Sequence, residues 1–385
     1  MAIHDSANRL ICFGWSIKHE RIGVDECMSR WQSAWRLIPL LAVLTFMLTG
    51  CGLENLTTLD PKGPVAEKSL SVIAISLIVM IGVFAVVMVI YVYVLVRFRK
   101  RKGQTGIPKQ VEGNHKLEII WTVIPFILLI VIAIPTVKYT FEMDKDYSKD
   151  PNALQVKVTG HQFWWEFEYM NEKVVTAQDL IIPTGKTIAF HLEAADVMHS
   201  FWVPALGGKK DTNPGMTNMH YLKADKPGIY YGKCAELCGQ SHALMDFKVK
   251  AVTPEEFDRW VTSMKSPGTT VLSAKASEGE KIFKDKCIGC HAIYNNQSKQ
   301  VEGGKVAPSL VDYADRTTVA GILPNRNPED LKNSLKTWLS DPQDVKPGNL
   351  MPNPMPVQGS KMEQDLGLNP QQIDSIIEYL AAQKQ

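Results

Sequence analysis

Two long apolar runs constrain the fold of this chain more than any other feature of its sequence. Residues 70–96 form an uncharged run of 27 residues, and residues 119–137 form another of 19. A helix needs about 20 predominantly apolar residues to cross the hydrocarbon core of a bilayer. The sequence therefore predicts two transmembrane helices. Pro125 and Pro135 lie in the second run, where proline is tolerated if neighbouring groups satisfy the freed carbonyls.

The segment between these runs is strongly basic and sets the expected orientation. Against one acid, Glu112, it carries Arg97, Arg99, Lys100, Arg101, Lys102, Lys109 and Lys116. Short basic loops stay in the cytoplasm, so the chain after residue 137 is expected outside. Binding of nucleic acid or lipid headgroups is the alternative for this cluster. The formal net charge of +2 over 385 residues argues against a general nucleic-acid binder.

The segment ahead of the first run reads as an export signal. Basic residues after Met28 precede an apolar stretch at 37–48, which ends in Thr49, Gly50 and Cys51. This ending resembles a bacterial lipobox, with Cys51 as the lipidated first residue of the mature protein. Translation is expected to start at Met28 rather than at Met1.

Residues 234–245 place soft metal ligands close together, namely Cys234, Cys238, His242 and Met245. Thiolate, imidazole and thioether suit copper, and a single-copper electron-transfer site needs only one Cys. The second Cys allows two sulfurs to bridge two coppers, with a second His from elsewhere in the chain. A disulfide and a structural zinc site are the alternatives. A disulfide leaves the His and the Met unexplained, and structural zinc rarely recruits Met.

A second motif, Cys287-Ile-Gly-Cys290-His291, matches the attachment pattern of c-type haem. A thioredoxin-like redox pair followed by an incidental His is the alternative. The Pro-rich segment 346–356 offers Met351 and Met355 as axial ligands, and we favour Met351.

Periodicity separates the exported part into two modules. Apolar alternation at 154–158, 188–192 and 247–251 predicts short antiparallel strands of a β-sandwich or barrel. Residues 263–276 look like a linker. Ser277 with Glu280 forms a capping box that is expected to open a helix leading to the haem cysteines, and Asn369-Pro370 opens the last helix.

The whole pattern resembles subunit II of cytochrome c oxidase, in the caa3-type form that carries a fused cytochrome c domain. The resemblance covers about residues 51–385. It rests on five segments: 118–125, Gly160-His161-Gln162, 196–200, 210–215 and the loop 234–245.

The resemblance implies a fold and a set of site residues. It implies a multidomain membrane protein with a two-helix transmembrane hairpin, an all-β cupredoxin-like copper-A domain and an all-α class I cytochrome c domain. The corresponding expected segments are an extension with a lipoprotein signal (1–50), an exported segment (51–69), the hairpin (70–140), the copper domain (150–255), the linker (263–276) and the cytochrome domain (277–385). Cys234 and Cys238 would bridge both coppers, with His199, His242, Met245 and the Glu236 carbonyl as further ligands.

Two carboxylates receive further roles from the resemblance. The Glu236 side chain would bind magnesium at the contact with subunit I, and Glu118 would stand near the mouth of a proton channel in that partner. One departure concerns Phe163, which stands where many members have Trp directly after Gly-His-Gln, so the usual route from a soluble cytochrome is in doubt. A fused haem would make that route unnecessary.

The expected function is electron delivery to a proton-pumping oxidase. A cytochrome c donor would reduce haem c, and electrons would pass through dinuclear copper A to haem a of subunit I, where oxygen becomes water. The chain would be a two-pass protein of a bacterial plasma membrane, with both soluble modules outside. It would assemble with subunit I and other oxidase subunits and bind no nucleic acid. Two alternatives are the copper-A subunit of a nitric oxide reductase and a membrane-tethered cytochrome without copper.

Overall fold

A computed structural model describes residues 55–384, apart from 101–102, 104–105, 108–109, 111, 267–270, 296 and 357–364, together with residues 39, 42 and 43. The predictions about Met28 and Cys51 lie outside the described residues.

Both apolar runs form long helices, as predicted. Helix α3 spans Pro64–Arg97 and helix α4 spans His115–Met143. Pro64 is at the first turn of α3, and the Asn114 side chain caps α4 by accepting from two backbone amides. Apolar side chains are exposed all round both helices, and both are long and apolar enough to cross a membrane. Such a surface is stable when lipid covers it.

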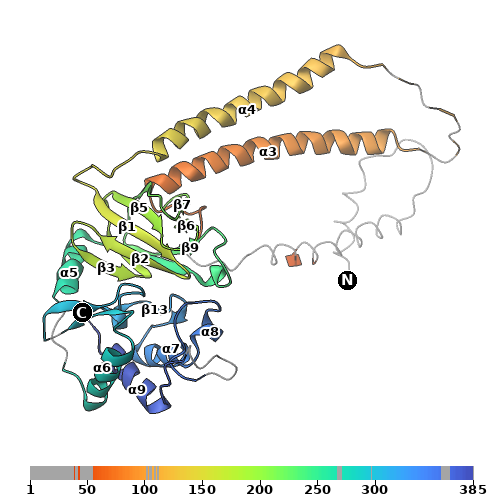
Figure 1. Ribbon diagram of the computed structural model, residues 1–385. Helices are drawn as coiled ribbons and strands as arrows, with labels where there is room; N and C mark the ends of the chain where they lie inside the picture. The colour runs from red at the N-terminus through yellow and green to blue at the C-terminus, as the bar shows by residue number, and fades with distance from the viewer. Residues whose placement is uncertain are drawn as a thin grey trace, which may run out of the picture. The chain divides into compact units, whose positions relative to one another are not determined.

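A two-sheet β-sandwich follows the helices (Figure 1). One sheet has the order β3-β2-β1-β5-β8 and the other β4-β10-β9-β6-β7. The strands are β1 (Leu154–His161), β2 (Trp164–Tyr169), β3 (Val174–Ala177), β4 (Asp179–Pro183), β5 (Ile188–Ala194), β6 (His199–Trp202), β7 (Lys210–Thr212), β8 (Asn218–Leu222), β9 (Gly228–Cys234) and β10 (Asp246–Val252). The core between them is aromatic, with the Phe201 ring 5.7 Å from Trp165 and 4.7 Å from Phe247 between centroids.

The predicted antiparallel arrangement is wrong for two strand pairs. Strand β1 pairs with β5 in parallel, and β4 pairs with β10 in parallel. Each pair is separated by several intervening strands along the chain, which leaves room for a crossover. Local alternation indicates which face of a strand is buried but carries no information on its distant partner.

Helix α5 (Pro254–Lys265) closes the sandwich. Thr253 and Glu256 form its capping box, and Trp260 packs on Tyr169 at 4.9 Å between ring centroids. Residues 263–265, which the sequence placed in the linker, belong to this helix.

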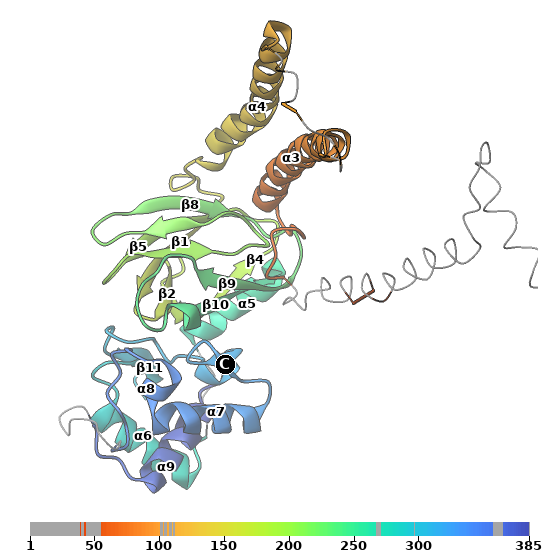
Figure 2. The ribbon, with the colours of Figure 1, turned by 90° about the vertical axis from the view of Figure 1, so that its right-hand side faces the viewer.

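The C-terminal module is mostly helical (Figure 2). Its helices are α6 (Ala274–Lys286), η2 (Tyr313–Asp315), α7 (Pro328–Ser340), α8 (Pro342–Val345) and α9 (Pro370–Ala381), and its short strands are β11 (Ala292–Asn295), β12 (Gln300–Gly303), β13 (Thr318–Val319) and β14 (Leu323–Pro324). Helices α6 and α9 cross with Phe283 packed on Tyr379.

The helix before the haem cysteines begins earlier than predicted. Its N-cap is Ser273, whose hydroxyl accepts from the amide of Ala276, and Ser277 lies inside the helix. Both residues are serines, which are favoured as caps, but the capping-box spacing of Ser277 and Glu280 indicated the wrong one. At the last helix the prediction is confirmed, because Asn369 and Gln372 form a capping box with Pro370 in the first turn.

The outer ends of both membrane helices are fixed to the sandwich. Val65 in the first turn of α3 is buried, and the Tyr221 hydroxyl donates to the carbonyl of Glu142 near the end of α4. Lys68 and Glu142 form an ion pair of 2.7 Å between the two helices. The sandwich therefore contacts the start of α3 and the end of α4. The basic segment joins the two helices at their other ends.

The crossing of α6 and α9 generates a stability prediction. A Cβ added at Gly279 would overlap the carbonyl of Ser375 on the facing helix. We expect Gly279→Ala to lower the free energy of unfolding by about 1–3 kcal/mol, since the backbone must move apart, despite the better helix propensity of Ala. Thermal unfolding followed by haem absorbance measures this.

Lys281→Ala is the matched control, because this side chain of the same helix is 77% exposed. Equal stability of the two variants would contradict the close crossing.

Candidate functional site

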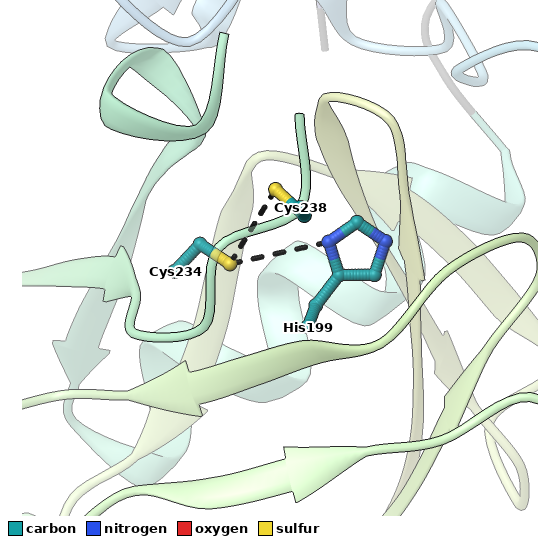
Figure 3. Close-up of side chains that lie close together, drawn as sticks. All are labelled: His199, Cys234 and Cys238. Atoms are coloured by element: carbon teal, nitrogen blue, oxygen red, sulfur yellow. Dashed lines mark hydrogen bonds between the residues drawn. The ribbon is translucent and has the colours of Figure 1, made fainter. Parts of the chain in front are cut away.

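The soft ligands predicted in 234–245 come together with His199 at one end of the sandwich (Figure 3). Strand β9 ends at Cys234, and β6 begins at His199 beside it, because Phe201 pairs with Cys234. The Cys234 sulfur is 3.9 Å from the Cys238 sulfur and 3.9 Å from Nδ1 of His199. Both cysteines are buried and free, so the structure contains no disulfide between them.

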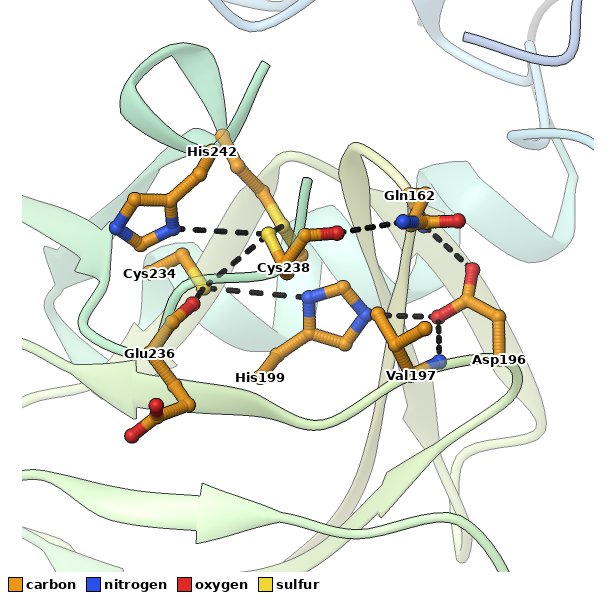
Figure 4. Close-up of polar contacts among 9 residues, drawn as sticks. Gln162, Asp196, Val197, His199, Cys234, Glu236, Cys238 and His242 are labelled. Atoms are coloured by element: carbon orange, nitrogen blue, oxygen red, sulfur yellow. Dashed lines mark hydrogen bonds and ion pairs between the residues drawn. The ribbon is translucent and has the colours of Figure 1, made fainter. Parts of the chain in front are cut away.

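The remaining ligands of the loop complete the cluster. His242 begins the 3₁₀ turn η1 (His242–Leu244), and its Nδ1 is 3.6 Å from the Cys238 sulfur. Met245 is fully buried with its sulfur 3.8 Å from the same atom. The Glu236 carbonyl oxygen is 3.3 Å from the Cys234 sulfur, and Figure 4 shows the Glu236 carboxylate pointing away from the sulfurs.

A carboxylate fixes the orientation of His199. Its Nε2 is 2.8 Å from Oδ1 of Asp196, which leaves Nδ1 facing the sulfurs. Asp196 also accepts from the backbone amides of Gln162 and Val197, both at 2.6 Å (Figure 4). A carboxylate on the far ring nitrogen sets the tautomer of a ligating His and raises its basicity. The Gln162 side chain donates to the carbonyl of Cys238 and so ties this group to the ligand loop.

The roles of Asp196 and Gln162 were not predicted. Gln162 and Asp196 both lie in segments that carry the family resemblance. The position of Asp196, three residues before His199, is the feature of the sequence that could have indicated its role. Gly160 of the same motif has a packing role, because a Cβ there would lie 2.8 Å from the His199 ring.

The site holds one thiol close to ionisation. Burial alone would raise the pKa of Cys234, but hydrogen bonds with His199 and with nearby backbone outweigh it and lower the pKa to about 7. Burial and the neighbouring Cys234 raise the pKa of Cys238 to about 12. A soft metal binds thiolates and would ionise both. The donor set fits copper, since two neighbouring thiols have an imidazole each beside them and a thioether close to one of them.

The haem motif follows α6. Cys287 caps this helix, and Cys290 and His291 lie in the next turn. Nδ1 of His291 is 2.8 Å from the carbonyl of Pro308 and donates to it, which leaves Nε2 as the free ligand atom. Burial lowers the pKa of His291, which favours the neutral ring. A neutral imidazole with one free nitrogen suits haem iron.

A cavity lies in front of this motif. Both cysteines, His291, Met351 and Trp338 line it, and Met355 does not. The opposite wall comes from the sandwich through residues 161–164. There, the His161 ring stacks on Trp164 with centroids 4.0 Å apart. Both haem-motif cysteines and His291 therefore face one cavity, which has Met351 rather than Met355 in its wall. Trp165, in contrast, is a fully buried core residue.

Glu118 lies in the first turn of α4, far along the chain from both sites. Its side chain is 45% exposed, and its Oε2 lies 2.8 Å from Nδ1 of His115, within hydrogen-bond distance.

Three sequence profiles match the chain in succession. They are the transmembrane domain of cytochrome c oxidase subunit II at residues 54–139, its periplasmic domain at 172–252, and cytochrome c at 276–384. Their order agrees with the helices, sandwich and helical module described above.

Relatives of this chain agree with the profiles. "Cytochrome c oxidase subunit 2" of Alkalihalophilus pseudofirmus is 47% identical over 330 residues, covering 84% of this chain and 93% of the relative. That of Bacillus sp. (strain PS3) is 46% identical over 364 residues, covering 91% and 98%. Among solved structures, the periplasmic domain of subunit II of cytochrome oxidase of Bradyrhizobium japonicum is 35% identical, covers 30% of this chain and 96% of its own, and has a TM-score of 0.29. The chain therefore belongs to the cytochrome c oxidase subunit II family, as a member with a cytochrome c domain fused behind its copper-A-type domain.

Proposed function

We propose that the chain accepts electrons from a cytochrome c donor at a covalent haem c and passes them through dinuclear copper A to haem a of subunit I, where oxygen is reduced to water. As a subunit of cytochrome c oxidase it supplies electron transfer, and the oxygen chemistry belongs to its partner. The observation that carries the proposal is the cluster of two buried thiols, a buried thioether, the buried His199 and the half-buried His242, all contributed by one loop and one neighbouring strand.

Each ligand has a proposed role that its position supports. Cys234 and Cys238 bridge two coppers, because their sulfurs are close and unbonded. His199 and His242 bind one at each side through Nδ1, and Met245 and the Glu236 carbonyl are the weaker ligands. A fully buried thioether beside the thiols favours copper over structural zinc, which rarely takes Met.

The haem site is assigned in the same way. Cys287 and Cys290 attach the haem, His291 binds iron through Nε2, and Met351 binds the opposite face. The free Nε2 and the position of Met351 in the cavity wall support this.

The outer contacts of the chain are also proposals. Subunit I is the partner that family membership implies, with both soluble modules on the outer side of the membrane. The Glu236 carboxylate, directed away from the sulfurs, would bind magnesium at that contact. Glu118 would stand at the mouth of a proton channel, where its exposed first-turn position is compatible. Lipidation of Cys51 would add an anchor beside the two helices.

The central test is a metal count on a fragment of residues 150–385, made in a host that attaches haem c. We expect two coppers sharing one unpaired electron, seen by electron paramagnetic resonance, and one covalent haem per chain. Copper-free protein with a Cys234–Cys238 disulfide would instead indicate a tethered cytochrome. Haem a in the complete complex separates an oxidase from a nitric oxide reductase.

Met245→Leu tests the axial thioether. We expect both coppers to stay bound, with an altered reduction potential and spectrum, because the thiolates hold the metal and the thioether tunes it. Redox titration of the copper signal measures this. Complete copper loss would contradict an axial role.

Met351→Ala tests the sixth iron ligand. We expect the haem to remain covalently attached while the reduced spectrum changes to that of iron without thioether ligation. Met355→Ala is the matched control and should leave the spectrum unchanged. The reverse pattern would assign the ligand to Met355.

A further inference from the structure

The segment of the cytochrome module that leads to Met351 lies directly against the copper-ligand loop. The Ser241 hydroxyl, next to His242, donates to the carbonyl of Pro347 at 2.8 Å. Gly348 follows with φ +78°, and a Cβ there would lie 2.6 Å from the Gln240 side-chain oxygen. The two ligand loops are therefore in contact at van der Waals distance, and the glycine is needed both for its backbone angle and for the close approach.

A buried lysine secures this contact. Lys346 is only 3% exposed, and its ammonium donates to the carbonyl of Phe163 at 2.9 Å. Burial lowers its pKa to about 8, with an opposing effect of Asp246. An ammonium is costly to bury, so its position depends on the acceptor across the contact. Phe163 directly follows Gln162, whose side chain donates to the Cys238 carbonyl.

A second group of hydrogen bonds joins the modules at a separate place. Asp179, a buried residue of β4, accepts from the backbone amide of Thr317 at 2.9 Å and from its hydroxyl at 2.9 Å. Lys248 of β10 donates to the same hydroxyl at 3.0 Å. Two anchors at different positions hold one module against the other more strictly than a single contact can.

The haem cavity lies between the modules that these anchors join. Its walls include both haem cysteines on one side and the stacked His161 and Trp164 on the other. The Nε2 atom of His161 is buried and has no hydrogen-bond partner among the described residues. A haem in this cavity would face aromatic groups of the copper domain rather than solvent on that side.

We propose that Lys346 and the Asp179–Thr317 pair are two docking anchors that hold the cytochrome module on the copper-ligand loop and thereby set the rate of electron transfer from haem c to copper A. The docking is a property of this chain alone, and its effect on the rate rests on the function proposed above. Lys346 is a positioning residue, because its ammonium binds the Phe163 carbonyl and not a ligand atom of either site.

The test uses the metal-loaded full chain in its complex, two single variants, Lys346→Met and Thr317→Val, and the double variant that combines them. Lys346→Met keeps the apolar stem and removes the donor, and Thr317→Val keeps the shape and removes the hydroxyl. Lys281→Met, on an exposed side chain of the cytochrome module, is the control. Amide hydrogen exchange at residues 162–165 and 240–242 reports docking. Flash reduction of haem c, followed by the copper absorbance, reports the rate.

Loss of a charge-assisted hydrogen bond should shift the docking equilibrium about tenfold. In Lys346→Met we therefore expect faster amide exchange at both segments and slower electron transfer from haem to copper. We expect a larger effect in the double variant and no change in the Lys281→Met control. Native haem and copper spectra in each variant show that both modules are folded.

Unchanged exchange in the double variant would overturn the docking anchors, whatever the metal content. Faster exchange with an unchanged transfer rate would overturn their effect on electron transfer. Absence of copper from the wild-type chain would refute the proposed function, and the exchange measurement would still decide the docking.

Discussion

The pairing of β6 with β9 is the contact on which the metal site depends. It aligns Phe201 with Cys234 and so brings His199, the first residue of β6, beside a loop that starts 35 positions later. Sheet pairing fixes backbone positions to a fraction of an ångström because each ladder hydrogen bond has strict geometry. The aromatic core under these strands prevents a shift in register, which would turn His199 to the other face.

From this pairing a chain of hydrogen bonds extends outward. Asp196 orients His199, the Gln162 amide orients Asp196, and the Gln162 side chain holds the Cys238 carbonyl. Rigid ligands matter in an electron-transfer site, because each change of charge would otherwise rearrange the surroundings. The next residue along, Phe163, accepts from Lys346 of the cytochrome module. One short segment therefore contacts both the loop proposed to bind copper and the cytochrome module.

Sequence reasoning predicted the parts of this protein better than their assembly. The two membrane helices, the soft-ligand loop and the haem motif each lie within a continuous stretch, where periodicity or spacing is informative. His199 came only from the family resemblance, since its distance along the chain hides its proximity. The parallel pairs β1–β5 and β4–β10 and the cap at Ser273 were missed, because strand partners and competing serines are chosen by tertiary packing.

Fusion of the two modules lowers the interaction energy that the contact between them has to supply. Two separate proteins must offset the lost freedom of association with interface energy, whereas modules on one chain meet at a high effective concentration. Besides the hydrogen bonds of Lys346 and Asp179, this contact includes Tyr294 and Val311 of the cytochrome module, which belong to the buried hydrophobic cluster of the sandwich. Phe163, in place of the usual Trp, has its side chain in the hydrophobic core of the sandwich, and its carbonyl accepts from Lys346. The segment 161–164 therefore lies against the cytochrome module of its own chain and lines the cavity that the two modules share.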